Sequence, residues 1–272
     1  MSLAAKLPWT HRFSGGFPGL SSQPLPTDAD AIDYLTRMAT ADGAGVETGV
    51  AVAVDAFFRD TKAAGVFDAL KACCILAGAR TLAGALVPVV GDAPTNVADG
   101  FVEGDYSRTS GLTGDGATTY LDTNFDASTL GQDDISMSIW AESFGTVGSQ
   151  SLIDQGRANS GASGIFVNIN TVASRCRSSA NNAFPSTSVG FSGISRSLST
   201  SYEQRNEATS ATRTVASQAP YSAGNVTLFN FSVAPNLYSD ARLAFWHVGT
   251  AIDLEDLETA VSNLITAIGE AL

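Results

Sequence analysis

Three oxygen-bearing side chains stand at alternate positions in the segment Asp122-Thr-Asn-Phe-Asp126. The spacing of Asp122, Asn124 and Asp126 matches the first half of a calcium-binding loop, and Asp133 stands where the closing carboxylate would be. Such a loop requires glycine where this chain has Ala127, and it closes with Glu rather than Asp. A turn capped by Asx side chains explains the same residues. A structural Ca²⁺ and a metal-free turn both stay open, the turn is favoured, and no other cofactor is expected.

The sequence shows no spacing that is typical of a catalytic site. Glycoside hydrolysis requires two carboxyl groups that flank the scissile bond, whereas the strand acids Glu142 and Asp154 each stand alone. Serine hydrolysis requires a base, and neither histidine, His11 or His247, is near the partial match Gly190-Phe-Ser-Gly193. His247 is instead expected to be a hydrogen-bonded strand residue. We therefore expect no catalytic residues and a non-enzymatic protein, with a polysaccharide hydrolase or lyase as a remote alternative.

Aromatic, amide and guanidinium groups occur together in segments that we expect to be strand ends and loops. A saccharide site on a β-sandwich uses an aromatic surface for the sugar ring and polar side chains for its hydroxyls. Turns rich in Asn and Ser have the same composition, so glycan binding and a purely structural surface both stay open. The candidate glycan-binding residues are Asn181, Asn182, Phe184, Tyr202, Arg205 and Tyr221.

The elements that must position these residues are mostly β-strands. Short segments alternate with turn residues at the spacing of an antiparallel sandwich. In Ser136-Met-Ser-Ile-Trp-Ala-Glu142, Met137, Ile139 and Ala141 share one face. The fold class is therefore predicted to be mainly β, an antiparallel concanavalin-like β-sandwich (jelly roll) over 78–252. The predicted strands are about 107–112, 117–123, 135–143, 150–156, 164–171, 173–178, 188–196, 199–206, 211–217, 225–234 and 240–249.

Helical patterns flank the predicted sandwich on both sides. Residues 28–77 are predicted to form a helical cap that is too small to bury a core alone, so it should pack on the sandwich or on another chain. Residues 253–272 are predicted to form a helix that begins after Asp253 and packs on the sandwich or a neighbouring subunit. Capping residues, apolar spacing and glycine stops place the helices of the cap at about 27–42, 47–64 and 67–74.

Residues 1–27 are dense in proline and glycine and are predicted to form an extended arm. The arm carries Trp9, Phe13 and Phe17, large apolar groups that a free linker rarely displays. These aromatic residues either anchor the chain to a partner or fold back on their own domain, and the anchor is the favoured interpretation.

The net charge and the hydropathy of the chain limit the classes of partner that it can bind. The net charge of −12, from 27 acidic and 15 basic residues, opposes binding to a phosphate backbone, so no nucleic acid is expected. No apolar stretch approaches the roughly 20 residues of a membrane-spanning helix, so no membrane insertion is expected. The N-terminus does not resemble a signal peptide. The three cysteines form neither a disulfide framework nor a metal set and are expected to be buried.

Five segments resemble phage-encoded laminin-G/concanavalin-like jelly-roll proteins. They are residues 72–91, Ala93-Pro-Thr-Asn96, Gly104-Asp-Tyr106, Gly111-Leu-Thr-Gly-Asp-Gly-Ala-Thr-Thr-Tyr-Leu-Asp122 and Ala241-Arg-Leu-Ala-Phe-Trp-His-Val-Gly249. The resemblance covers about residues 28–272 and consists of structural glycines and core residues. Members of that group are tail fibres, head fibres and other exposed virion parts. The resemblance therefore implies a virion surface protein of the head-fibre, tail-fibre or decoration type, made in the host cytoplasm without a signal peptide.

The same resemblance implies the partners. The N-terminal arm is expected to bind other virion proteins of the capsid or tail, and the chain is expected to form a homo-oligomer. The alternative function is a host-attachment protein, an adhesin or receptor-binding module, whose sandwich binds a host surface glycan.

Overall fold

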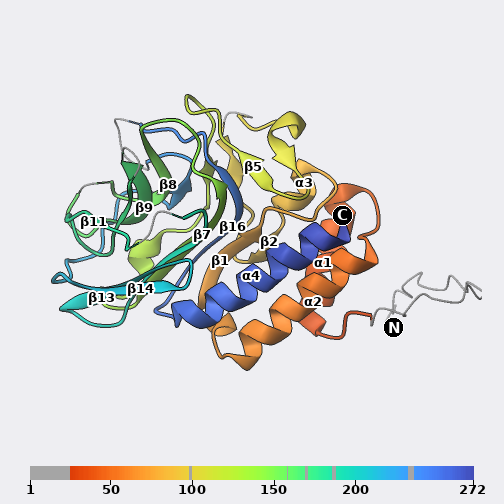
Figure 1. The fold of residues 1–272 in the computed structure, drawn as a ribbon, viewed down its shortest axis with the longest axis horizontal. Coiled ribbons are helices and arrows are strands. Elements are labelled where there is room, and N and C mark those ends of the chain that lie inside the picture. The colour runs from red at the N-terminus through yellow and green to blue at the C-terminus, as the bar shows by residue number, and fades with distance from the viewer. Residues whose placement is uncertain (1–24, 98–99, 158, 169–170, 186–187, 232–235) are drawn as a thin grey trace, which may run out of the picture.

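The computed structural model describes residues 25–97, 100–157, 159–168, 171–185, 188–231 and 236–272. It confirms the predicted fold class, because two antiparallel sheets face each other, with helices before and after them (Figure 1). The predicted arm residues Trp9, Phe13 and Phe17 lie outside the described residues.

The larger sheet contains nine strands, in the order β14-β13-β12-β7-β16-β1-β2, with β5 beside β16 and β4 beside β5. At its centre β7 pairs antiparallel with both β12 and β16. The strands of this sheet are β1 (Leu70–Ile75), β2 (Pro88–Val90), β4 (Tyr106–Ser107), β5 (Gly111–Thr113), β7 (Ile135–Ser143), β12 (Gly190–Arg196), β13 (Ser201–Asn206), β14 (Thr209–Thr214) and β16 (Arg242–Gly249).

The smaller sheet contains seven strands in the order β11-β10-β9-β8-β15-β6-β3. Within the described residues, the predicted strands 117–123 and 225–234 are reduced to two residues each. In the second of them Phe229, with φ 64°, turns the chain out of the strand. The strands of this sheet are β3 (Thr95–Asn96), β6 (Leu121–Asp122), β8 (Ser149–Gln155), β9 (Ser163–Asn168), β10 (Thr171–Arg175), β11 (Asn182–Ala183) and β15 (Thr227–Leu228).

The two sheets enclose the main hydrophobic core. Met137, Ile139 and Ala141 of β7 are all buried in it, which confirms their predicted shared face. Trp246 of β16 is the largest fully buried side chain among the described residues. Burial of this much apolar surface supplies most of the favourable free energy of folding.

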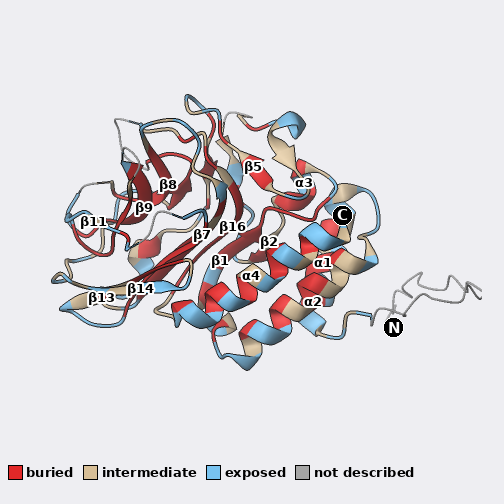
Figure 2. Cartoon of the chain, viewed as in Figure 1, coloured by how far each residue is buried: buried red, intermediate tan, exposed pale blue. Residues whose placement is uncertain are grey.

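A layer of helices covers the other face of the nine-stranded sheet. Figure 2 shows α2 (Thr48–Ala63) and α4 (Leu254–Ala271) side by side over this face, with their buried sides turned inward. Their apolar residues form a second core with the sheet, for example Phe57 against Phe245 at 5.9 Å between ring centroids. The layer also includes α1 (Ala29–Asp42) and the short α3 (Leu82–Ala85). The central strands of the nine-stranded sheet are therefore buried on both faces, whereas the edge strand β14 is largely exposed.

The predicted helix over 67–74 is wrong. Residues Phe67–Ala69 form a single 3₁₀ turn, and Leu70–Ile75 is strand β1 between β16 and β2. Cys74 faces the core between the sheets, whereas Cys73 and Ile75 face the helices. Because both faces are buried, the strand has a continuous apolar sequence, which periodicity cannot distinguish from a short buried helix. The large sheet thus begins inside the segment expected to be a helical cap.

The other predicted helices are confirmed. Asp28 caps α1 through hydrogen bonds from the backbone N–H groups of Asp30 and Ala31, and Asp253 caps α4 in the same way. The three cysteines are buried and free, as expected. Within the described ranges, no helix has the length and apolar character that crossing a membrane requires.

Candidate functional site

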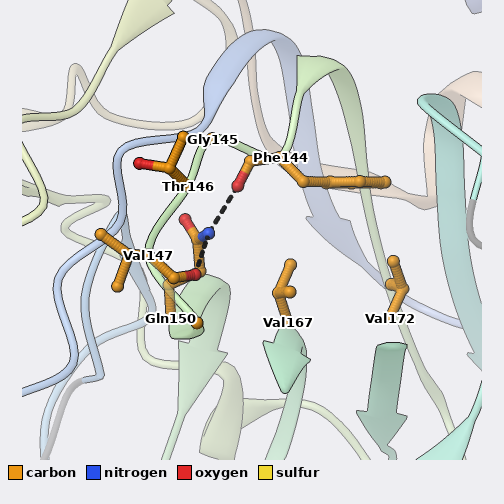
Figure 3. Close-up of a pocket in the computed structure, with 8 residues that line it drawn as sticks. Phe144, Gly145, Thr146, Val147, Gln150, Val167 and Val172 are labelled. Atoms are coloured by element: carbon orange, nitrogen blue, oxygen red, sulfur yellow. Dashed lines mark hydrogen bonds between the residues drawn. The ribbon is translucent and has the colours of Figure 1, made fainter. Parts of the chain in front are cut away.

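An open hollow of about 300 Å³ lies at the end of the sandwich where β7 passes into β8 (Figure 3). The loop between these strands forms one side, and β9 and β10 of the smaller sheet form the other. The hollow is lined by Phe144, Gly145, Thr146, Val147, Gly148, Gln150, Val167 and Val172.

One wall of the hollow is apolar. Val167 of β9 and Val172 of β10 belong to the core between the sheets and line the hollow from there. Phe144 is half-buried, and in Figure 3 its ring extends above the two valines. Strand alternation explains the position of the valines, because each is an inward-facing residue near the hairpin that joins β9 to β10.

The opposite wall is a glycine-flanked loop that the protein holds from two sides. The buried Gln150 Nε2 donates to the carbonyl oxygens of Phe144 (2.5 Å) and Val147 (2.9 Å). The Asp240 carboxylate accepts from the backbone N–H of Thr146 (2.7 Å) and from its hydroxyl (2.8 Å). Burial opposes ionisation of Asp240, but the hydrogen bonds from this loop outweigh it and lower the pKa. The loop is therefore fixed before any ligand arrives.

This arrangement suits a ligand with one apolar and one polar side. An apolar ring face can pack on Phe144 and the valines, while hydroxyl groups reach Thr146 and the loop backbone. Among the described residues that line the hollow, none carries a carboxylate, imidazole or thiol.

The structure contradicts part of the predicted glycan site. Phe184 and Tyr202 are only 6% and 2% exposed, and both belong to the core between the sheets. Burial raises the pKa of Tyr202 to about 12, and its hydroxyl lies 3.2 Å from the hydroxyl of Ser174. Arg205 is buried on the opposite face of the larger sheet, where it pairs with Glu258 of α4. Tyr202 and Arg205 lie on opposite faces of β13, so strand alternation directs the first into the core between the sheets and the second toward α4. Phe184 directly follows β11 and is buried in the core between the sheets.

The other three glycan candidates lie nearer the surface, on a different part of the sandwich. Asn181 is exposed and accepts a hydrogen bond from Arg175 Nε at 3.1 Å. Asn182 is half-buried in β11. Tyr221 is half-buried against Gly156, where an added Cβ would lie 2.6 Å from the tyrosine ring. Their role in glycan binding stays a prediction.

The candidate cation ligands form hydrogen bonds within turns. Asp122 Oδ1 accepts from the backbone N–H of Asn124 (2.8 Å), and Asp126 Oδ1 accepts from that of Ser128 (2.8 Å). Asn124 has φ 56°, a conformation that Asn tolerates in turns. In the part of the chain that the structure describes, no group of three or more His, Cys, Asp or Glu residues could hold a metal ion. The geometry at these residues is that of Asx turns. Binding of a structural Ca²⁺ here stays a prediction.

The groups considered for catalysis are held in structural contacts. Glu142 accepts a hydrogen bond from Trp140 Nε1 at 2.7 Å. Asp154 is buried with its carboxylate 3.9 Å from Arg175. His247 is fully buried, with hydrogen bonds to Ser136 (2.9 Å) and Ser138 (2.6 Å), and burial lowers its pKa to about 3. His247 is therefore a hydrogen-bonded strand residue, although it lies inside the protein rather than at a sheet surface.

One residue that lines the hollow, Phe144, could have been identified from the sequence. Phe144 stands in Ser143-Phe-Gly-Thr-Val-Gly148, between two predicted strands. An aromatic residue in a glycine-flanked loop between strands is a candidate contact residue, because binding residues are frequent in loops held by a rigid scaffold. The two valines carry no such signal, since their sequence context is that of ordinary core residues.

Comparisons with known proteins find similar structures but no similar sequences. No protein-family profile matches the sequence, and no curated protein is significantly similar to it. The botulinum neurotoxin serotype D binding domain is 9% identical, with a TM-score of 0.47 over 72% of this chain and 51% of that chain. The CBM40 of the Ruminococcus gnavus IT-sialidase, solved with α2,3-sialyllactose, is 12% identical, with a TM-score of 0.39 over 51% of this chain and 91% of that chain.

The NanB sialidase of Streptococcus pneumoniae is 12% identical, with a TM-score of 0.39 over 50% of this chain and 26% of that chain. The match thus spans about a quarter of the sialidase and about half of the toxin chain. These neighbours are toxin and sialidase parts rather than phage proteins, so the phage resemblance stays a prediction. At these identities and scores, the likeness concerns only the general arrangement of a β-sandwich.

Proposed function

We propose that this chain is a non-enzymatic binding module that takes a saccharide in the hollow beside Phe144. The observation that carries the proposal is that an apolar wall and a polar loop, which Gln150 and Asp240 hold in place, face one open space of about 300 Å³. A sugar ring has a C–H face that packs on aromatic and aliphatic groups and a rim of hydroxyls that form hydrogen bonds. Both requirements meet here within one hollow.

The state of the ionisable groups supports binding rather than catalysis. Acid–base catalysis requires a group with a pKa near the working pH and with access to the substrate. His247 has neither property, because it is fully buried and its pKa is lowered to about 3. Asp240, the carboxylate beside the hollow, is committed to the loop through Thr146 and Val147.

Replacing Phe144 by Ala is expected to reduce saccharide affinity about tenfold, the loss of about 1.4 kcal/mol that removal of one aromatic contact causes. The measurement is a glycan array with the full chain, followed by titration of the best ligand. Val189→Ala is the matched control, because Val189 is a 50% exposed apolar residue in another loop. An array with no ligand, or equal affinity for Phe144→Ala and the control, would contradict the proposal.

We also propose, as a second function, that the module is displayed on a phage particle as a head-fibre, tail-fibre or decoration subunit. The sequence resemblance supports this location. The fold is compatible with it, because α1, α2 and α4 lie on one side of the nine-stranded sheet and the seven-stranded sheet lies on the other (Figure 1). Attachment through the segment that precedes α1 would leave the smaller sheet and the hollow free to face outward.

Deletion of residues 1–24 is expected to abolish incorporation into particles and to leave a folded chain with the circular dichroism spectrum of the full protein. The physical reason is that Trp9, Phe13 and Phe17 supply the apolar anchor of the arm. Substituting these three residues by Ala should have the same effect, whereas substituting Lys6 and Arg12 should not. Unchanged incorporation of the deletion variant would show that the arm is not the anchor.

A further inference from the structure

One sheet edge of this protein lacks the usual protection against pairing. Exposed strand edges attract other strands, and proteins protect them with short strands, proline, charge or bulges. Of the four strands that end the two sheet orders, β2 has three residues and β3 and β11 have two each. The fourth, β14, has six residues.

Strand β14 is regular over its whole length. All six residues, Thr209–Thr214, pair in register with β13, without a bulge. The strand contains no proline and no lysine, and Arg213 is its single charged residue. A two-residue turn of Glu207 and Ala208, both with positive φ, joins it to β13 and fixes the register.

The turn determines which backbone groups of β14 point away from the sheet. A two-residue hairpin makes its flanking residues, here Asn206 and Thr209, a hydrogen-bonded pair, and the pattern then alternates. Thr209, Ala211 and Arg213 therefore bond to β13, whereas Ser210, Thr212 and Thr214 direct their N–H and C=O groups outward. Within the described part of the chain, no strand lies on that side of β14 and no backbone partner of these three residues is found.

We propose that β14 pairs with β14 of a second copy of this chain, antiparallel, about a two-fold axis at Thr212. In this register Thr212 lies opposite Thr212 of the second copy, Ser210 lies opposite Thr214, and Ala211 lies opposite Arg213. All three outward-directed residues of each strand are then in hydrogen-bonded positions, about six bonds in total. The larger sheets of the two copies become continuous.

Self-complementarity favours a second copy over an unrelated extended peptide. The register places each Arg213 opposite Ala211, so no like charges face each other directly. The same patch serves both partners, as an interface with two-fold symmetry requires. Each chain carries a net charge of −12, which opposes association, so dimerisation should strengthen as salt screens the repulsion. An interface limited to one strand edge is small, which predicts a weak dimer.

The test is sedimentation velocity of the full chain over about 1–100 μM, the range in which a weak dimer dissociates. Thr212→Pro is expected to weaken dimerisation about 30-fold or more, because it removes the central outward N–H from both copies. The monomer fold should persist, since that N–H takes no part in pairing with β13. Thr212→Val, which keeps the N–H and suits a strand, is the control and should dimerise like the unmodified chain.

Amide hydrogen exchange gives a residue-specific readout of the same proposal. The N–H groups of Ser210, Thr212 and Thr214 should exchange slowly at high protein concentration and rapidly at low concentration. Those of Thr209, Ala211 and Arg213 should be protected at both. A monomer at all concentrations and salt levels, or a dimer that survives Thr212→Pro, would overturn the proposal. Loss of the dimer when residues 1–24 are deleted would also overturn the proposal, because it would place the interface in the arm.

Discussion

Replacing Glu258 by Ala is expected to lower the free energy of unfolding by about 3–5 kcal/mol, the cost of leaving a buried charge without its partner. The Glu258 carboxylate accepts from Arg205 Nε of β13 and from the backbone N–H of Ala208 at 2.7 Å. The side chains of Arg205 and Glu258 are each about 10% exposed, so water cannot replace the missing oxygen atoms. The contact also joins α4 to the hairpin that carries β14. Urea denaturation at neutral pH measures the effect.

Glu255 provides the matched control for this prediction. It lies one turn earlier on α4 and reaches Arg205 Nη1 at 3.4 Å, but its side chain is 72% exposed. Glu255→Ala should therefore change the free energy of unfolding by about 1 kcal/mol or less. Substituting Arg205 by Met together with Glu258 by Leu should recover most of the stability that Glu258→Ala loses. Equal stabilities of Glu258→Ala and Glu255→Ala would contradict this account of the pair.

The elements that local chemistry determines were predictable from the sequence. Asp28 and Asp253 cap the helices that they were predicted to start, and β7 spans the predicted residues 135–143. These signals lie within a few residues of one another along the chain, so they need no knowledge of tertiary contacts. The fold class followed from them.

The predictions that failed depended on contacts distant in sequence. Strand β1 pairs with β16, more than 160 residues later, and is covered on both faces, so its apolar sequence resembled a helix. Tyr202 and Arg205 were taken as surface groups because the sequence does not show which face of β13 meets the sandwich core and which meets α4. Polar residue types in a strand do not reveal that a second layer covers them.

The hollow was unpredictable for a related reason. Phe144 lies in the loop that crosses from β7 of the larger sheet to β8 of the smaller sheet, and Gln150 lies in β8, whereas Val167 and Val172 belong to the hairpin of β9 and β10. The pairing of β8 with β9 brings the crossing loop and this hairpin together. A sequence can identify an aromatic residue in a loop, but the space beside it depends on the tertiary structure.

The protein is expected to lose about 2 kcal/mol of stability between pH 6.5 and pH 4.5 because of His247 alone, with a slope that approaches about 1.4 kcal/mol per pH unit below the ordinary pKa of the imidazole. His247 is neutral in the fold. Ser136 Oγ donates to the carbonyl of Thr250, so it can accept from the Nε2–H of the imidazole, and Ser138 can then donate to Nδ1. Burial lowers the folded pKa to about 3, whereas the ordinary value is 6.5. Below pH 6.5 the unfolded chain therefore binds a proton that the folded chain excludes, so the free energy of unfolding decreases as the pH is lowered.

Urea denaturation at a series of pH values tests this prediction, and His247→Gln should remove most of the slope between pH 6.5 and 4.5. Aspartates whose pKa is lowered in the fold, such as Asp28 and Asp55, lose most of their stabilising contribution near and below their ordinary value of 3.8, outside this window. Glu47, with an ordinary value of 4.5, contributes to the slope at the lower end of the window. His11→Gln is the control for the other histidine and should keep the slope. If His247→Gln retains the full slope, the imidazole does not cause the acid sensitivity. Ser136 bonds both to His247 and to the carbonyl of Thr250, which precedes α4, so protonation of the buried imidazole would also disturb the contact at the start of this helix.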